Sequence, residues 1–186
     1  MMIALAMFVS CLVGAAVGGN NWALLVAGSN TYDNYRHQAD ICHAYHIVSS
    51  HGIPDERIVV MMYDDIANNP DNPFPGNIIN RPGGPNVYPG VPKDYTGAVS
   101  CCANNNSAIN NKTYFIHSGP EDRVFVNFAD HGAPGILAFP IRHAALEIQM
   151  CLLPPVYATT AANSDESSYA CYYDNTRKTC LGDVYS

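Results

Sequence analysis

Hydrophobic residues in this chain gather in uninterrupted runs, and three of the runs are typical of strands buried on both faces. They cover residues 22–28 (WALLVAG), 58–63 (IVVMMY) and 123–129 (RVFVNFA). A continuous apolar run of about four to eight residues that ends at glycine or at polar residues favours such a strand. Two further runs, 136–139 and 156–162, predict a fourth and a fifth strand, and a tyrosine- and serine-rich turn region follows.

The segment between the first two strands repeats with the period of a helix. Its apolar side chains recur three and four residues apart, at Ile41, Ala44, Tyr45 and Val48. This spacing predicts a helix over residues 34–51 with one buried stripe, ended by Gly52 and Pro54. A strand, a helix and a strand in succession form a right-handed parallel unit. The sequence therefore predicts an α/β fold.

Residues 67–97 depart from this pattern. Prolines, glycines and asparagines crowd there, and no period survives. A loop of that length inside a compact domain is usually functional or disordered.

Composition narrows the class of protein. The chain has 186 residues, with 9 lysines and arginines against 16 aspartates and glutamates, so its formal net charge is −7. Because no basic run accompanies this acidic balance, the sequence excludes a nucleic-acid-binding surface. A hydrophobic share of 48% and a charged share of 13% suit one globular domain rather than a disordered chain.

The N-terminal residues have the features of an export signal. Residues 1–19 carry no charge, are apolar up to Val17 and end in small residues. Such a stretch is too short for a comfortable membrane span. We expect residues 1–19 to be a cleaved signal peptide, residues 20–186 to form the domain, and no membrane span to remain. Asn105 and Asn111 stand in Asn-x-Ser/Thr sequences, so both are predicted glycosylation sites.

Polar residues follow the third predicted strand, at the carboxyl edge of the sheet, where open parallel sheets bind their ligands. An imidazole at His131 can act there as a general base, and the Gly132 N–H can face an oxyanion. Asp130 precedes them, and the loop after the first strand brings Asn34 and Arg36 to the same edge. From position alone, a histidine with a purely structural role is the more common outcome.

Two other features favour a metal site only weakly. His43 and His46 lie three residues apart on the predicted helix, but no ligand cluster completes a zinc site. Asp64 and Asp65 form one acidic pair, and a single pair is weak evidence for a site that binds a hard cation. Nucleotide-binding and serine-hydrolase motifs do not occur in the sequence. The sequence therefore predicts neither a metal nor a cofactor.

Long segments of the chain nevertheless resemble one family. They lie within residues 21–97, 118–140 and 156–186, and include GIPDERIVVMMYDDIA, SGPEDRVFVNFADHGAPGILAFP and SSYACYYD. These segments are similar to those of the legumains, the asparaginyl endopeptidases. The resemblance implies a caspase-like, mostly parallel sheet flanked by helices, and cleavage of peptides after asparagine by a cysteine nucleophile. It also implies a lysosomal or vacuolar location, or secretion, and cystatin-type inhibitors as partners.

The resemblance also implies roles for individual residues. The family's catalytic histidine falls on His131 and its orienting asparagine on Asn34, while Asp130 matches an aspartate linked to succinimide formation. The pocket that recognises asparagine matches four residues: Arg36, His37, Ser168 and Asp183. A guanidinium can donate to the carboxamide oxygen while a carboxylate accepts from the carboxamide nitrogen. Side chains without that pattern would leave the buried partners unpaired, so the pocket would select asparagine.

One part of the family's pattern is missing. In the family, a further strand follows ILAFP and leads to Glu-Ala-Cys-Glu-Ser-Gly-Ser, which carries the nucleophile. Here residues 141–155 follow instead, and their only cysteine, Cys151, has different neighbours. We expect an incomplete sheet that lacks a central strand and the C-terminal part of the domain. The first hypothesis is a legumain-type enzyme in a truncated or mis-spliced form, inactive for want of the thiol. The alternatives are a non-catalytic decoy that binds asparagine-containing peptides, or a glycosylated secreted domain without a ligand.

Overall fold

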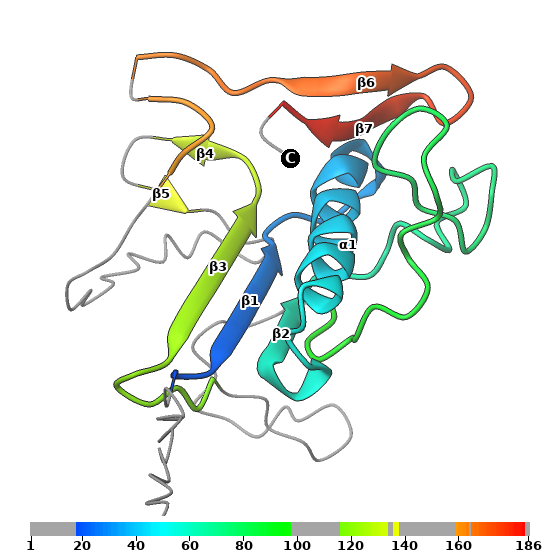
Figure 1. Cartoon of the computed structure of the whole chain (residues 1–186). Helices are drawn as coiled ribbons and strands as arrows, with labels where there is room; N and C mark the ends of the chain where they lie inside the picture. The colour runs from blue at the N-terminus through cyan, green and yellow to red at the C-terminus, as the bar shows by residue number, and fades with distance from the viewer. Residues whose placement is uncertain (1–17, 98–115, 134–135, 138–158, 164, 185–186) are drawn as a thin grey trace, which may run out of the picture.

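A three-stranded parallel sheet forms the centre of the molecule (Figure 1). The computed structural model describes residues 18–97, 116–133, 136–137, 159–163 and 165–184. Within them, β1 (Asn21–Ala27) lies between β2 (Ile58–Met61) and β3 (Arg123–Ala129) and runs parallel to both. Leu24 of β1 pairs with Val59 on one side and with Val126 on the other. The predicted α/β class and the three parallel strands are confirmed.

One long helix, α1 (Tyr35–Ser50), packs against the sheet (Figure 1). A short 3-10 turn, η1 (Tyr32–Asn34), leads into α1, and a second, η2 (Asp55–Arg57), precedes β2. Gly52 follows the helix with φ of 91°, a conformation that favours glycine. The predicted stripe is buried with the central strands, in a core that includes Ile41, Ala44, Tyr45, Val48, Leu25, Ala27 and Val60. Within the described residues, no helix is long and apolar enough to cross a membrane.

The loop over residues 67–97 is held by side-chain hydrogen bonds rather than by regular secondary structure. The buried amide of Asn72 donates to three backbone carbonyls at 3.0 to 3.3 Å. Asn86 Oδ1 accepts from two backbone N–H groups. The loop also adds Ile78, Val87 and Val91 to the core. Its asparagines therefore supply the partners that backbone groups in a loop need when they are withdrawn from water.

The C-terminal part of the described chain differs from the prediction. The predicted turn region contains an antiparallel hairpin of β6 (Ala170–Asp174) and β7 (Thr179–Asp183). The hairpin escaped prediction because Tyr172 and Tyr173 on β6 are exposed, so no apolar–polar alternation marks the strand. The predicted strand over residues 156–162 is wrong for residues 159–162, which are mostly exposed and form no strand. Its first residues lie outside the described ones.

The apolar run at 136–139 does not join the main sheet either. Its described residues form β5 (Ile136–Leu137), which pairs antiparallel with β4 (Gly132–Ala133). A pair of two-residue strands directly after His131 turns the chain at the end of β3. The described residues of this apolar run therefore form a separate small sheet after β3 instead of a further strand of the main sheet.

The strand β3 is less buried than its uninterrupted apolar sequence predicts. Val124, Phe125 and Val126 retain between 43% and 49% of their exposure. Among the described residues β3 pairs only with β1, so it forms an edge of the sheet. The prediction that this strand is buried on both faces is therefore wrong for the described structure. The apolar edge agrees with the expectation of an incomplete sheet.

Candidate active site

Polar side chains gather where the carboxyl ends of β1 and β3 meet the start of α1. The pairing of the two strands continues to Ala27 and Ala129, so both end at the same level. The chain then leaves β3 through Asp130 and His131. Three more polar residues come from η1 and the first turn of α1: Asn34, Arg36 and His37. We call this cluster the junction.

His131 is held by Asn34, as predicted. Its Nε2 lies 2.7 Å from Asn34 Oδ1, and the Asn34 amide is oriented by its own hydrogen bond to Asn30 O at 2.9 Å. Because an amide oxygen only accepts, Nε2 carries the proton and Nδ1 of the neutral ring carries the lone pair. Burial, and then the charge of Arg36, lowers the pKa of His131. The ring is therefore neutral at pH 7 and can act as a base.

Arg36 of the junction is paired with Asp183, which we count as part of the junction from here on. Arg36 Nε donates to Asp183 Oδ1 at 2.8 Å, and the two side chains retain only 14% and 17% of their exposure. Arg36 Nη2 also lies 3.5 Å from His131 Nδ1. Asp183 ends β7, which packs on α1, so the fold joins residues 147 positions apart in the sequence. Two of the four predicted pocket residues thus lie together beside His131.

His37, the third predicted pocket residue, is 1% exposed and lies behind this pair. Its Nδ1 is 2.5 Å from Ser29 Oγ, a partner that the sequence did not reveal. Its Nε2 is 3.5 Å from Asp183 Oδ2. Burial, and then the charges of Arg36 and His131, lowers the pKa of His37 to about 3. The ring is therefore neutral, and its carboxylate contacts are those of a polar neutral group rather than salt bridges.

Asp130 lies at the base of the junction with 3% of its side chain exposed. Its Oδ1 accepts from the His131 N–H at 2.7 Å, and Oδ2 has no hydrogen-bond partner. Burial raises the pKa of Asp130 to about 6, although the bond from His131 and the charge of Arg36 lower it. A buried carboxylate oxygen without a partner costs free energy.

A buried hydrogen-bond network behind the junction locks β7 to α1. Asn80 Nδ2 donates to Asp40 Oδ1 on α1 at 2.6 Å and to Leu181 O on β7 at 3.0 Å. Gly182 packs so closely that a Cβ there would lie 2.9 Å from Asn80 Nδ2. Asn80 and Asp40 were not predicted, because a single loop asparagine gives no signal for a contact 101 positions away.

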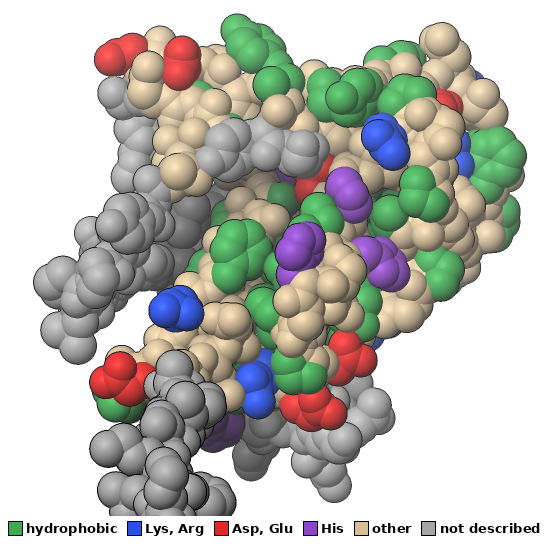
Figure 2. Space-filling model, in the orientation of Figure 1, with side chains coloured by type: hydrophobic (Ala, Val, Ile, Leu, Met, Phe, Trp, Pro, Cys, Tyr) green, Lys and Arg blue, Asp and Glu red, His purple; other side chains and the backbone are tan. Residues whose placement is uncertain are grey.

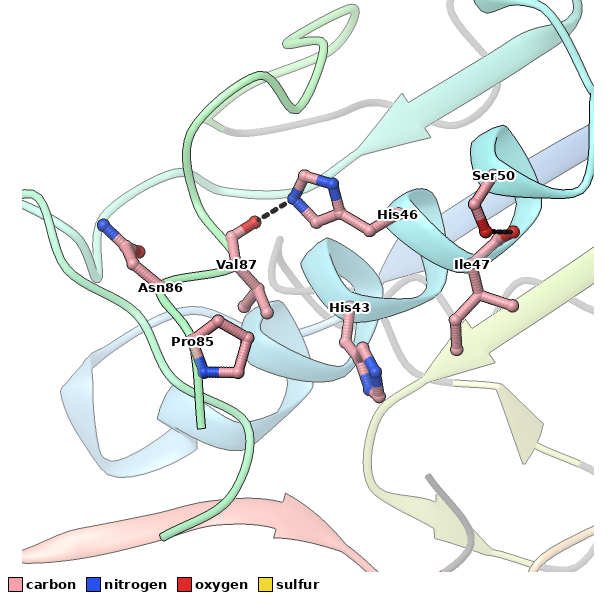
Figure 3. Close-up of a pocket in the computed structure, with 7 residues that line it drawn as sticks. All are labelled: His43, His46, Ile47, Ser50, Pro85, Asn86 and Val87. Carbon is pink, nitrogen blue, oxygen red and sulfur yellow. Dashed lines mark hydrogen bonds between the residues drawn. The ribbon is translucent and has the colours of Figure 1, made fainter. Parts of the chain in front are cut away.

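A separate shallow pocket of about 340 Å³ lies between α1 and residues 85–87 (Figure 3). His46 Nε2 is 2.9 Å from Val87 O, and His43 Nδ1 is 2.8 Å from Asn80 Oδ1. Figure 2 shows histidine side chains at the surface over this part of α1, where His43 and His46 are half-buried. Each ring ties the helix to the loop, which favours a structural role over the metal site considered above.

The remaining candidate residues divide into two groups. Asp64 accepts from the Tyr88 hydroxyl, and Asp65 accepts from a backbone N–H and a glutamine amide, so both carboxylates have structural partners. Ser168 is exposed in the segment before β6, and its place in the pocket stays a prediction. Residues 1–17, Asn105, Asn111 and Cys151 lie outside the described residues.

The fold and the junction define an α/β protein with an imidazole base at the carboxyl edge of its sheet, an arrangement suited to a hydrolase. Comparison with known proteins specifies the family. Residues 21–154 and 149–186 match the peptidase C13 family. The chain belongs to this family, and the resemblance to the legumains is confirmed.

Individual relatives support this assignment. The chain is 50% identical to a legumain of Rattus norvegicus and 48% identical to one of Homo sapiens, in each case over 91% of the chain and 48% of the relative. It is 40% identical to a vacuolar-processing enzyme of Vicia sativa, over 90% of the chain and 44% of the relative. The chain thus spans about half the length of the curated relatives it matches.

The comparisons also bear on the segment that the sequence analysis found missing. The two legumain alignments extend over 209 residues, whereas the whole chain has 186. The relatives therefore have residues where this chain has none. The family match falls into two pieces that overlap at residues 149–154, within the 141–155 segment.

Proposed function

We propose that this chain carries the histidine side of an asparaginyl cysteine endopeptidase site, and that its pocket binds peptides through an asparagine side chain. The observation that carries the proposal is the junction itself. His131 Nδ1, which carries the lone pair, lies 3.5 Å from Arg36 Nη2, and Arg36 is paired with Asp183 at 2.8 Å. An imidazole and a guanidinium–carboxylate pair therefore share one edge of the sheet, which supports a base next to a pocket for a carboxamide.

The pair can recognise a carboxamide. A carboxamide offers an accepting oxygen and two donor hydrogens. Arg36 donates to the oxygen through the N–H groups that Asp183 does not occupy, and a carboxylate oxygen of Asp183 accepts from the nitrogen. An aspartate in the same place would set a second carboxylate against Asp183, and like charges at close range repel. Asparagine therefore fits this pocket better than its acidic analogue.

The catalytic step requires a thiol next to His131. Nδ1 would take the thiol proton, Asn34 would stabilise the imidazolium through its bond to Nε2, and the Gly132 N–H would face the oxyanion. Within the described residues, no cysteine lies at hydrogen-bond distance from His131, and burial raises the pKa of Cys42 to about 12. We therefore propose that the chain as written binds asparagine peptides without cleaving them, which is the decoy alternative.

The cellular setting belongs to the same proposal. Legumains and vacuolar-processing enzymes as relatives favour a lysosomal or vacuolar compartment, or secretion, after removal of residues 1–19. Asn105 and Asn111 would then carry glycans. Peptides with asparagine at the cleavage site and cystatin-type inhibitors would be the partners.

Binding of three labelled peptides that differ only at one position, asparagine, glutamine or aspartate, tests the proposal by fluorescence anisotropy. We expect the asparagine peptide to bind at least about tenfold more tightly than the glutamine peptide, since one methylene shifts the carboxamide out of register. Arg36→Lys should abolish this preference, because an ammonium lacks the planar fork of donors. Exposed His51→Gln serves as the control.

Two results would overturn the proposal. Equal affinity for the three peptides would show that no carboxamide pocket exists and would leave the structural domain as the function. Turnover of an asparagine-ending reporter at pH 5–6, abolished by Cys151→Ala, would show that the chain is an active peptidase rather than a decoy.

A further inference from the structure

Three side chains with metal-binding atoms meet in the junction. His37, Asp130 and His131 each present one such atom, and the three atoms lie within 4.8 Å of one another. The sequence did not group them as ligands, because His37 belongs to α1 and the other two follow β3. The fold alone brings them together.

The distances suit a small divalent cation. Zinc lies about 2.0–2.2 Å from nitrogen and oxygen ligands, so two ligands of a tetrahedral ion are about 3.3 Å apart. His37 Nδ1 and Asp130 Oδ1 are 3.6 Å apart, which is too long for a hydrogen bond and close to that separation. His131 is exposed, so an ion can reach the cluster from the solvent side without repacking the core.

Asp130 provides a second, independent observation. Its side chain is 3% exposed, and the buried Oδ2 has no hydrogen-bond partner. Buried polar atoms are almost always paired, and an unpaired one calls for an explanation such as a bound ion. A cation bound at Oδ2 would supply the missing partner, while Oδ1 keeps its hydrogen bond from the His131 N–H.

In both imidazoles Nε2 faces an oxygen, so Nδ1 is the nitrogen that would bind the ion, and Arg36 Nη2, now 3.5 Å from His131 Nδ1, would be displaced. His131 Nε2 donates to Asn34 Oδ1 at 2.7 Å, and His37 Nε2 faces Asp183 Oδ2 at 3.5 Å. Histidine ligands of metals characteristically donate their remote N–H to an oxygen in this way, which fixes the ring. The Ser29 hydroxyl, now 2.5 Å from His37 Nδ1, would turn away on binding.

The charges around the cluster permit a cation despite the nearby guanidinium. Among the described residues Arg36 contacts the cluster, and its pairing with Asp183 at 2.8 Å offsets its charge. The carboxylate of Asp130 then remains to balance part of the charge of a divalent ion. Imidazole nitrogen with one carboxylate favours zinc over magnesium, which prefers oxygen ligands alone.

We propose that His37, Asp130 and His131 form a binding site for one divalent transition-metal ion, with Zn²⁺ as the best match. The ion occupies the lone pair of His131 that the proposed peptidase chemistry requires, so metal binding and general-base action exclude each other. The binding itself does not depend on the proposed function.

Calorimetric titration of ZnCl₂ into the full chain tests the site. The chain carries no histidine tag, and its accessible thiols are alkylated so that cysteines do not bind the metal. We expect one Zn²⁺ per chain at this site and an affinity at least about 100-fold lower in Asp130→Asn, which keeps the shape of the side chain but loses the charged ligand. MgCl₂ should give no comparable heat.

Two controls make the result decisive. His51→Gln removes an exposed imidazole outside the cluster and should bind Zn²⁺ like the parent chain, while His131→Gln should lose affinity as Asp130→Asn does. Circular dichroism checks that each variant stays folded. Equal affinity in the parent, Asp130→Asn and His131→Gln chains would overturn the proposal, and so would the absence of binding to the parent. Neither outcome bears on peptide recognition, which the anisotropy assay measures separately.

Discussion

At the scale of single residues, the junction depends on which nitrogen of each imidazole carries the proton. Asn34 sets this for His131, because its amide is itself held by Asn30 O and presents only an oxygen to Nε2. The sequence can predict that two such residues meet, since strand ends of a parallel sheet lie at one edge. It cannot predict the hidden partner Ser29, whose hydroxyl orients His37.

The tautomer of His131 is the first prediction at this scale. Replacing Asn34 by alanine removes the acceptor for Nε2–H, so the neutral ring should change from the Nε2–H form to a mixture of both tautomers. Imidazole ¹⁵N chemical shifts at pH 8 report this directly. Asn68→Ala, at an exposed asparagine, should leave the His131 signals unchanged. Retention of the pure Nε2–H form in Asn34→Ala would mean that another group fixes the ring.

Asp94 gives a prediction of pH dependence outside the junction. Burial raises the pKa of this carboxyl, although its bond from the Val60 N–H lowers it. The native state therefore binds the Asp94 proton more tightly than the unfolded chain does, and this group lowers stability as pH rises through its unfolded pKa. Asp94→Asn keeps an acceptor for Val60 and removes the charge, so it should stabilise the chain at pH 7.

The stability gained by Asp94→Asn should shrink as pH falls to about 3, below the usual aspartate pKa of about 3.9. At that pH the parent carboxyl is protonated and uncharged, like the asparagine that replaces it. Urea unfolding of both chains at pH 7 and pH 3 measures the two differences. A variant that is less stable than the parent at pH 7 would show that the Val60 bond needs the charge.

At the scale of elements, the spacing of apolar residues predicted the helix and strands whose pattern does not depend on distant contacts. The buried stripe of α1 and the continuous apolar runs of β1 and β2 leave a signal that does not depend on distant partners. The β6–β7 hairpin does depend on them, because its buried side is made by contact with α1 and the loop, through residues such as Leu181 and Arg177. Exposed tyrosines on β6 conceal its strand pattern. The pocket residue Asp183 could therefore be assigned only by resemblance.

The close packing of β7 on α1 leads to a prediction about Gly182. A Cβ there would lie 2.9 Å from Asn80 Nδ2 and 3.0 Å from Asn80 O, so β7 must move outward. We expect Gly182→Ala to destabilise the chain by about 1–3 kcal/mol, as overpacking does. It should also weaken asparagine-peptide binding, because Asp183 moves with the strand.

Gly119→Ala is the matched control for this substitution. Its Cβ would meet no atom closer than Asp122 Oδ2 at 3.9 Å, so both stability and binding should stay near those of the parent. Urea unfolding and the anisotropy assay give the two readouts. If Gly182→Ala bound the peptide normally, the alignment of β7 would not control the pocket.

At the scale of the whole molecule, the described residues combine a polar edge with an apolar one on the same sheet. The Asn80 network joins α1 and β7 behind the polar edge, whereas among the described residues the sheet ends at the apolar strand β3. The sequence indicated this imbalance through the segment missing from the family's pattern, and the alignments, longer than the chain, agree with it. The proposed peptide binding and the proposed loss of catalysis are compatible, because they depend on different segments of the chain.

The exposed strand leads to the last prediction, which concerns aggregation. Val124 and Val126 are 43% and 46% exposed on a strand that pairs with only one neighbour among the described residues. Such an edge offers unpaired backbone groups and apolar side chains to a second molecule, so the parent chain should aggregate and melt below about 55 °C. Val126→Lys adds a charge that natural edges use to prevent such pairing, and it should slow aggregation.

Because Val126 is already half exposed, the lysine should change the free energy of unfolding by no more than about 0.5 kcal/mol. The same substitution at Val60, which is fully buried, should unfold the chain, since an unpaired charge in a core has no compensation. Light scattering at 37 °C and chemical unfolding separate the two effects. A parent chain that stays monomeric and melts cooperatively above 55 °C would show that β3 is protected in solution. In that case the sheet would be complete without the family's additional strand.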